Sequence, residues 1–295
     1  MPSAVQIPLI RLSNLFPDAE IYAKCEFLAQ SGSFKDRGAA HLLRHLRQDG
    51  HTGLLVVPSM GNTALAAATA AKEFGFSMVG VVPQAISRAK DEKLQSLGAE
   101  LIKITGGGSA LISAATEIAE KRAGYFMHPH LDHLWTDGYQ AIAEEILQAL
   151  PQCRTLVFPI GGGGLLMGLT EYFKRQPSSV KLIGCDAYNY PTYASFDHAR
   201  IPTIADGLVL EVPHTKVQQR IQEMGIAIHL VKDVDIRTAM AELYSRHALV
   251  VEPSSAIVAA FVKAHLHELE QPAGIILTGA NITRDDFLRL VSETG

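Results

Sequence analysis

The sequence predicts an α/β protein with mostly parallel sheets, and two observations support this class. Six short runs rich in Val, Ile and Leu occur along the chain, and longer stretches rich in Ala, Leu and Glu lie between several of them. Short apolar runs are typical of strands buried on both faces of a parallel sheet, whereas Ala, Leu and Glu favour helices. Their alternation predicts open sheets with helices on their faces.

The individual elements follow from these runs. The predicted strands are 53–58, 76–83, 99–104, 154–160, 180–186 and 273–279. The predicted helices are 35–49, 62–74, 109–123 and 139–150. In the helical stretches, apolar side chains recur at the spacing of one helix face. No linker, charge block or fixed repeat divides the chain, so any two domains are expected to interleave.

Composition excludes several functional classes. The chain has 295 residues, 19% of them charged, and a formal net charge of -4, which offers no basic surface for nucleic acid. Neither a secretory signal nor an apolar run near the roughly 20 residues that cross a membrane is present. We expect a cytoplasmic protein that binds neither nucleic acid nor membrane. Cys25, Cys153 and Cys185 lack CxxC spacing, which predicts reduced thiols.

Four strand-to-helix junctions have unusual composition. In open α/β sheets, ligands bind at the carboxyl ends of the strands, so these junctions are the first candidates for a site. They are SGSFKDRG at 31–38, PSMGN at 58–62, PIGGGGLLMG at 159–168 and TGAN at 278–281.

The glycine turn, formed by Gly161, Gly162, Gly163 and Gly164, lies between a predicted strand and a predicted helix. Bare backbone amides at a helix N-terminus bind anions, and four glycines are costly in chain entropy if they only form a turn. The sequence lacks the Gly-Lys-Ser/Thr of a nucleotide loop and the third glycine of GxGxxG. A single phosphate ester is therefore the expected ligand, with a plain tight turn as the alternative. A second glycine run, 106–108, is expected to be a loop.

Lys35 stands among small polar residues at the predicted start of a helix. A helix N-terminus disfavours an ammonium ion, so the pKa of this lysine is expected to be lowered. A neutral amine is available for Schiff-base chemistry. The alternative is a solvated surface lysine that happens to precede a helix.

Together these motifs resemble the fold type II enzymes that use pyridoxal 5'-phosphate (PLP), the tryptophan synthase β-subunit superfamily. KCEFLAQSGSFKDRGA at 24–39 is similar to the family's lysine segment, PSMGNT at 58–63 to its asparagine loop, GGGG to its phosphate cup, and TGAN to its pyridine-nitrogen segment. Weaker similarity is found in KLQSLGAELI at 93–102, IADGL at 204–208 and VVEPSSA at 250–256. The resemblance implies two interleaved, open, twisted and mostly parallel sheets flanked by helices.

The resemblance also implies roles for cofactor-binding residues. Lys35 would form the internal aldimine with PLP and act as the base at Cα, and Phe34 would pack beside the cofactor ring. Asn62 would hydrogen-bond the phenolic oxygen, the glycine turn would hold the phosphate, and Thr278 would meet the pyridine nitrogen. A hydroxyl at that nitrogen stabilises a protonated ring less than a carboxylate does, which favours elimination over transamination.

The substrate carboxylate would be held by the loop that contains Ser59, Met60, Gly61, Asn62 and Thr63. Two residues of this loop depart from the family pattern. The dehydratases usually have histidine where Thr63 stands. The racemases carry serine where Met60 stands, and a thioether cannot relay a proton, which disfavours racemisation.

Several other polar residues are candidate ligands for a metal or the cofactor. His128, His130 and His133 in HPHLDH lack a clear carboxylate partner, and Asp186 is the one obvious oxygen ligand in CDAYNYPTY. No metal is therefore predicted. In EPSSA, Glu252 is expected near the cofactor edge, with a helix N-cap at Ser254 as an equal explanation of the motif. Asp206 in IADGL is expected to be structural.

The predicted activity is PLP-dependent β-elimination from a small hydroxy amino acid such as threonine or serine, giving a 2-oxo acid and ammonia. One alternative is a β- or γ-replacement transferase, because QSGSFKDRGA and GNTA resemble threonine synthase. Another is a noncatalytic binding module. The resemblance implies a homodimer with a large cofactor domain, 1–56 and 134–295, and a small mobile substrate domain, 57–133. The short stretch after TGAN predicts no regulatory domain at the C-terminus.

Overall fold

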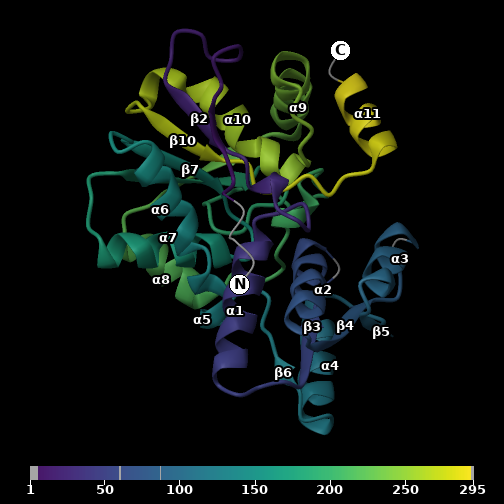
Figure 1. Cartoon of the computed structure of the whole chain (residues 1–295). Helices are drawn as coiled ribbons and strands as arrows, with labels where there is room; N and C mark the ends of the chain where they lie inside the picture. Colours follow the sequence, from purple (N-terminus) through teal and green to yellow (C-terminus); the bar gives the residue numbers. More distant parts are fainter. Residues whose placement is uncertain (1–5, 60, 87, 294–295) are drawn as a thin grey trace. The chain divides into compact units, whose positions relative to one another are not determined.

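The computed structural model describes residues 6–59, 61–86 and 88–293. Met60, predicted to bind substrate, lies outside the described residues. The chain forms two compact units, one from residues up to Gly32 together with those from Gln140 onward, and one from Ser33–Tyr139. Each unit has its own largely parallel sheet with helices (Figure 1). The predicted α/β class is confirmed.

The first unit contains a six-stranded sheet in the described part of the chain. Its order is β1 (Leu9–Arg11), β2 (Ile21–Lys24), β10 (Ala273–Ile276), β7 (Thr155–Pro159), β8 (Lys181–Ala187) and β9 (Ala227–Val231). Only the β1 and β2 pair is antiparallel among these strands. Residues of β7 and β10 are all buried, as expected for central strands covered on both faces.

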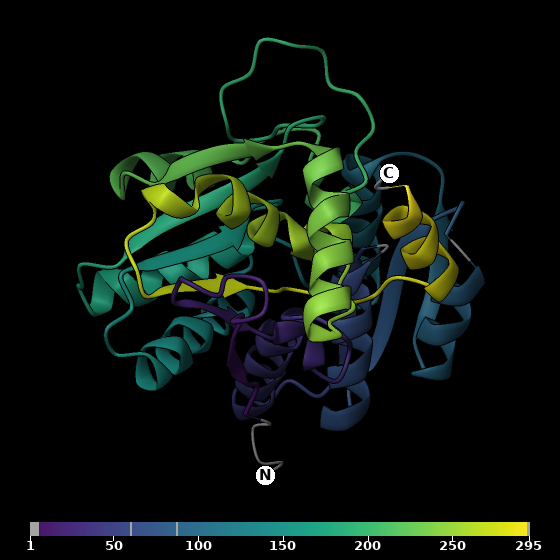
Figure 2. The ribbon, with the colours of Figure 1, turned by 90° about the horizontal axis from the view of Figure 1, so that it is seen from above.

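Helices cover this sheet on both faces. They are α6 (Gln140–Ala149), α7 (Gly164–Arg175), α8 (Thr215–Glu223), α9 (Asp233–His247), α10 (Pro253–His265) and α11 (Arg284–Ser292), with short 3-10 turns at Glu26–Leu28, Asp206–Leu208 and Leu266–Glu268. The first ten residues of α10 are buried, so this helix lies in the core. Figure 1 shows α10 on one face and α6 and α7 on the other. The long connection from β8 to α8 extends away from the sheet in Figure 2.

The second unit has a four-stranded parallel sheet within its described residues. The strand order is β5 (Glu100–Ile104), β4 (Ser77–Pro83), β3 (Leu54–Pro58) and β6 (Tyr125–Phe126). Its helices are α1 (Lys35–Gln48), α2 (Asn62–Phe74), α3 (Arg88–Ser96), α4 (Gly108–Lys121) and α5 (His133–Asp137). All the alanines of α2 are buried, and their small side chains let this helix pack closely against its neighbours.

The structure matches the six predicted strands and four predicted helices to within a few residues. The sequence interpretation missed β1, β2, β6 and β9, which are short or lie near sheet edges. The glycine run 106–108 is only partly a loop, because α4 already begins at Gly108. The second unit is longer than the predicted substrate domain 57–133, since α1 packs against both α2 and α5. That 57–133 moves as a domain stays a prediction.

Candidate functional site

The glycine turn forms an uncapped helix N-terminus in the first unit. The backbone leaves β7 at Pro159 and enters α7 through Gly163, which has a left-handed conformation with φ of 87°. The Met167 amide donates to the Gly163 carbonyl at 2.9 Å, and Gly163, as the N-cap residue, has no side chain that could cap the helix. In a helix, the N-cap amide and the next three have no acceptor within the helix itself. The turn therefore presents converging N–H donors to an anion.

Two neighbouring segments determine that only glycine fits in this turn. A Cβ atom at Gly161 would lie 2.9 Å from the Leu208 Cα atom, and one at Gly163 would lie 2.5 Å from Val217 Cγ2. Both distances are shorter than real Cβ contacts. Leu208 is the last residue of the IADGL motif, and Val217 is fully buried on α8. The glycine turn is thus packed between Leu208 and Val217, which leaves no room for side chains and fits a site that binds phosphate through the main chain alone.

The motif EPSSA supports the IADGL segment. The Ser254 hydroxyl accepts a hydrogen bond from the Gly207 amide at 3.1 Å. The predicted helix N-cap at Ser254 is wrong, because α10 begins at Pro253 with Glu252 as its N-cap residue. Proline at the first helical position is favoured since its missing N–H has no acceptor there. Ser254 instead fixes the loop that covers the glycine turn.

Thr278 lies at the same edge of the sheet as the glycine turn. Strands β10 and β7 are parallel neighbours, with Ile275 paired to Val157. Strand β10 ends at Ile276 and β7 at Pro159, so Thr278 and the glycine turn follow the carboxyl ends of two neighbouring strands. Adjacent strands are about 4.8 Å apart, and the Thr278 side chain is buried, with 4% of its surface exposed. The Thr278 hydroxyl and the glycine turn are therefore at the same end of the parallel strands.

The TGAN segment also holds the chain that leads to Lys35. The Ala280 amide donates to the Gly32 carbonyl at 3.0 Å, and Asn281 Nδ2 donates to the Ser31 carbonyl at 2.9 Å. Gly32 has φ of 85°, and a Cβ atom there would lie 2.7 Å from Asn281 Oδ1. The backbone amide of Asn281 donates to Glu252 Oε2 at 3.2 Å. Three of the predicted motifs are thus bonded to one another.

Lys35 is the first residue of α1, as the sequence predicted, and belongs to the second unit. Its Nζ atom lies 4.8 Å from the ring centroid of Phe34 and 5.8 Å from that of Tyr139. Tyr139 is fully buried, and burial raises the pKa of its hydroxyl well above the ordinary value. The sequence interpretation missed Tyr139, because no local motif distinguishes it from a core aromatic residue.

The asparagine loop forms a second uncapped helix N-terminus, in the same unit as Lys35. Helix α2 begins at Asn62 with Gly61 as its N-cap, and no side chain caps it. The Gly61 amide donates to the Ser59 hydroxyl at 3.2 Å, and the Ala64 amide donates to the Gly61 carbonyl at 3.0 Å. Thr63 is buried. Amides at the start of α2 are suited to a carboxylate.

The structure gives the candidate metal ligands other roles. His128 Nδ1 accepts from the amides of His130 and Leu131 at 3.2 and 3.1 Å, which fixes a turn. The buried Asp186 carboxylate accepts from the amides of residues 187, 192, 193 and 194, and burial raises its pKa. Over the described ranges, no cluster of three or more His, Cys, Asp or Glu side chains could hold a metal ion.

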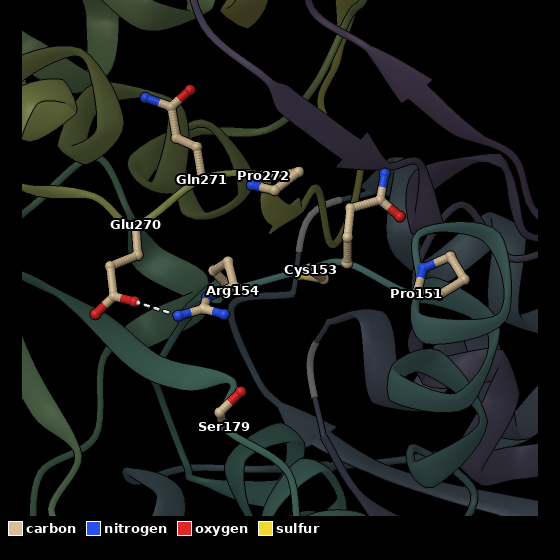
Figure 3. Close-up of a pocket in the computed structure, with 8 residues that line it drawn as sticks. Pro151, Cys153, Arg154, Ser179, Glu270, Gln271 and Pro272 are labelled. Atoms are coloured by element: carbon tan, nitrogen blue, oxygen red, sulfur yellow. Dashed lines mark hydrogen bonds and ion pairs between the residues drawn. The ribbon is translucent and has the colours of Figure 1, made fainter.

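A cavity of about 540 Å³ lies at the other end of the first sheet. It is lined by residues around Cys153 and Pro272, which precede β7 and β10. Arg154 and Glu270 form an ion pair at 3.4 Å on its wall (Figure 3). Since the glycine turn and Thr278 follow the same two strands, this cavity is at the opposite edge and is separate from them.

Comparisons with known proteins agree with these motifs. The family model for pyridoxal-phosphate dependent enzymes matches residues 2–279. The L-threonine ammonia-lyase of Thermotoga maritima is 31% identical over 281 residues, covering 93% of this chain and 70% of that protein. No helix among the described residues is both long and apolar enough to span a membrane.

Solved structures share the fold. Threonine deaminase isoform 2 from Solanum lycopersicum, in its processed form, matches with a TM-score of 0.89 at 24% identity, covering 99% of this chain and 89% of that one. Serine racemase from Dictyostelium discoideum matches with a TM-score of 0.80 at 25% identity, covering 94% and 93%. Because a deaminase and a racemase both have this fold, the fold alone does not decide the reaction.

Proposed function

Because the chain belongs to the pyridoxal-phosphate dependent enzyme family, we propose that it deaminates a small hydroxy amino acid such as threonine or serine by β-elimination, releasing a 2-oxo acid and ammonia. The observation that supports the proposal is the parallel pairing of β7 and β10, because the glycine turn and the buried Thr278 follow the carboxyl ends of these two strands. A phosphate cup next to a single hydroxyl fits PLP. When bound, the cofactor withdraws electrons from Cα of the substrate.

The proposed cofactor-binding residues keep the roles that the sequence predicted. We propose that the glycine turn binds the phosphate, that Thr278 donates to or accepts from the pyridine nitrogen, and that Lys35 is bonded covalently to the cofactor aldehyde. Phe34 would pack beside the ring, and Asn62 would contact the phenolic oxygen. Glu252, which accepts from the Asn281 amide, would lie near the edge of the ring.

The substrate class is supported by the relative from Thermotoga maritima, which is an L-threonine ammonia-lyase. We propose that the substrate carboxylate binds at the N-terminus of α2. Ser59, Met60, Gly61, Asn62 and Thr63 would surround it. Gly61 has open space where a Cβ atom would be, which leaves room for a ligand at this turn. The hydroxyl at Thr278, unlike a carboxylate, supports elimination in preference to transamination.

Lys35 would carry the proton in this reaction. Its amine would take the proton from Cα of the substrate and give it to the hydroxyl as the Cβ–O bond breaks, so that the hydroxyl leaves as water. The enamine that is set free reacts with water to give the 2-oxo acid and ammonium ion. The fixed amides of the two helix N-termini would hold the phosphate and the carboxylate in place during these steps.

The test is incubation of the purified chain and PLP with L-threonine or L-serine. We expect equal amounts of 2-oxo acid and ammonia, and no product from Lys35→Ala. Absence of both products from the unaltered chain would overturn the proposal. Adding a thiol distinguishes replacement from elimination, because a transferase would form a thioether amino acid instead. A binding module without activity would retain no cofactor on Lys35 after borohydride reduction.

We also propose that the chain acts as a homodimer in the cytoplasm, with residues 57–133 moving as a small domain. The three cysteines are free and buried, which is typical of proteins from reducing compartments. Light scattering during size-exclusion chromatography would measure the mass. Hydrogen exchange with and without substrate would test movement, with altered protection confined to 57–133 as the expected result.

A further inference from the structure

Three aromatic residues lie near Lys35 in the second unit, and we call them the aromatic bracket: Phe34, Trp135 and Tyr139. The rings of Phe34 and Tyr139 are 4.8 Å apart between centroids, at an angle of 45°. Trp135 Nε1 donates a hydrogen bond to the Tyr139 hydroxyl. Trp135 and Tyr139 have no exposed surface. The position of the Tyr139 ring is therefore fixed by packing and by a buried hydrogen bond.

Two glycines, which lack a Cβ atom, allow the aromatic bracket to lie close to the start of α1. A Cβ atom at Gly38 would lie 2.7 Å from both Trp135 Nε1 and the Trp135 carbonyl, and one at Gly138 would lie 2.4 Å from the Arg37 carbonyl. His41 Nδ1 is also bonded to the Leu134 carbonyl at 2.7 Å. Helix α1 and the segment around α5 thus touch through their backbones at the level of Lys35.

We propose that Tyr139 is a positioning residue for Lys35, whose side chain it holds, together with Phe34, as an ammonium ion over two aromatic faces. Both ring centroids are within the roughly 6 Å at which a cation is attracted to a ring. This inference rests on the proposed role of Lys35 as the base. The bracket favours the protonated amine, which is the form that Lys35 takes after removing the proton from Cα.

The bracket opposes another influence on the same amine. Lys35 is the first residue of α1, and a helix N-terminus disfavours a cation by an amount comparable to the attraction of an exposed ring. Three charged residues stand close to Lys35 or Tyr139 in the sequence: Asp36 and Arg37 on α1, and Asp137 at the end of α5. All three remain when only the Tyr139 ring is altered, so the ring can be tested separately.

The experiment compares Tyr139→Leu with Tyr139→Phe in the full-length chain freed of cofactor. Phenylalanine keeps the aromatic face and removes only the hydroxyl, whereas leucine removes the face. Acetic anhydride reacts with neutral amines, and peptide mass spectrometry measures its reaction at Lys35 as a function of pH. Lys121, whose side chain is 75% exposed, serves as the internal reference. The midpoint pH at Lys35 should fall by about half a unit in Tyr139→Leu and remain unchanged in Tyr139→Phe.

Equal midpoints in the unaltered chain and Tyr139→Leu would overturn the inference, as would equal shifts in both variants. Circular dichroism checks that each variant is folded. If Tyr139→Leu fails to fold, Phe34→Leu removes the nearer ring from a partly exposed position, and the same fall of the midpoint is expected. Because labelling needs no turnover, a shift without deamination would refute the proposed function alone, and deamination without a shift would refute this inference alone.

Discussion

Replacing Gly163 by alanine tests whether the glycine turn is fixed by its surroundings. Gly163 has φ of 87°, and the new Cβ atom would lie 2.5 Å from Val217 Cγ2. The left-handed conformation costs an alanine roughly 1–2 kcal/mol, and overpacking a buried site costs about 1–3 kcal/mol. The free energy of unfolding should therefore fall by about 2–5 kcal/mol. Movement of the turn should also weaken PLP binding.

Gly50→Ala is the matched control. Gly50 has φ of 80°, but nothing lies within 4 Å of a Cβ atom there. This variant therefore carries the conformational cost of roughly 1–2 kcal/mol without crowding. The free energy of unfolding in urea and the dissociation constant of PLP, measured by absorbance titration, should separate the two variants. Gly50→Ala should bind PLP as the unaltered chain does.

A double substitution decides whether Val217 is the cause. Val217→Ala removes the crowding methyl groups, so adding it to Gly163→Ala should restore part of the lost PLP affinity, although Val217→Ala alone is destabilising. The reasoning is refuted if Gly163→Ala loses no more stability than Gly50→Ala, or if PLP affinity is the same with and without Val217→Ala in the Gly163→Ala background.

Three further substitutions or conditions test the remaining contacts. Thr278→Ala should still bond PLP at Lys35 but lower kcat by about tenfold, since one hydrogen bond of about 1–1.5 kcal/mol is lost; an unchanged kcat would exclude Thr278 from the site. Asn281→Ala removes the bond to the Ser31 carbonyl and should lower the free energy of unfolding by about 1 kcal/mol in urea, with Asn14→Ala as an exposed comparison. Finally, burial lowers the pKa of His41 from 6.5, so the unfolded chain binds more protons there, and stability should decrease as the pH falls below 6.5. Urea midpoints at pH 7.5 and 5.5 measure this decrease, which His41→Asn should reduce. The same direction applies to His214, His229 and His247.

The sequence was sufficient for elements with a strong local pattern. Five of the six apolar runs are central parallel strands, which are largely apolar because both faces of the sheet are covered, whereas β5 lies at a sheet edge. Strand β9 was missed since it lies at the sheet edge, where Ala227 is exposed and the next residues are half-buried. Strand β1 has only three residues and pairs antiparallel. Neither has a pattern that separates it from a loop.

Within the candidate site, main-chain features were easier to predict than the side chains around them. A run of glycines indicates that the backbone is exposed to a ligand or closely approached by neighbouring atoms, so the sequence alone predicted the glycine turn. A helix cap at Ser254 was one of two explanations for EPSSA because serine often has that role, whereas here its partner is Gly207, 47 positions earlier in the chain. Local rules cannot identify a partner at that separation.

The side chains that decide the properties of the turn and of Lys35 lie far from the motifs in sequence. Val217 is 54 residues beyond Gly163, and Tyr139 is 104 residues beyond Lys35. Each looks like an ordinary core residue, since burial and apolar contact are all that a single sequence reveals about it. The motif residues bind the ligand, but the packed side chains determine their direction and charge state. A chain with the same four motifs and different residues at these two positions should therefore differ in cofactor affinity and in the basicity of its lysine.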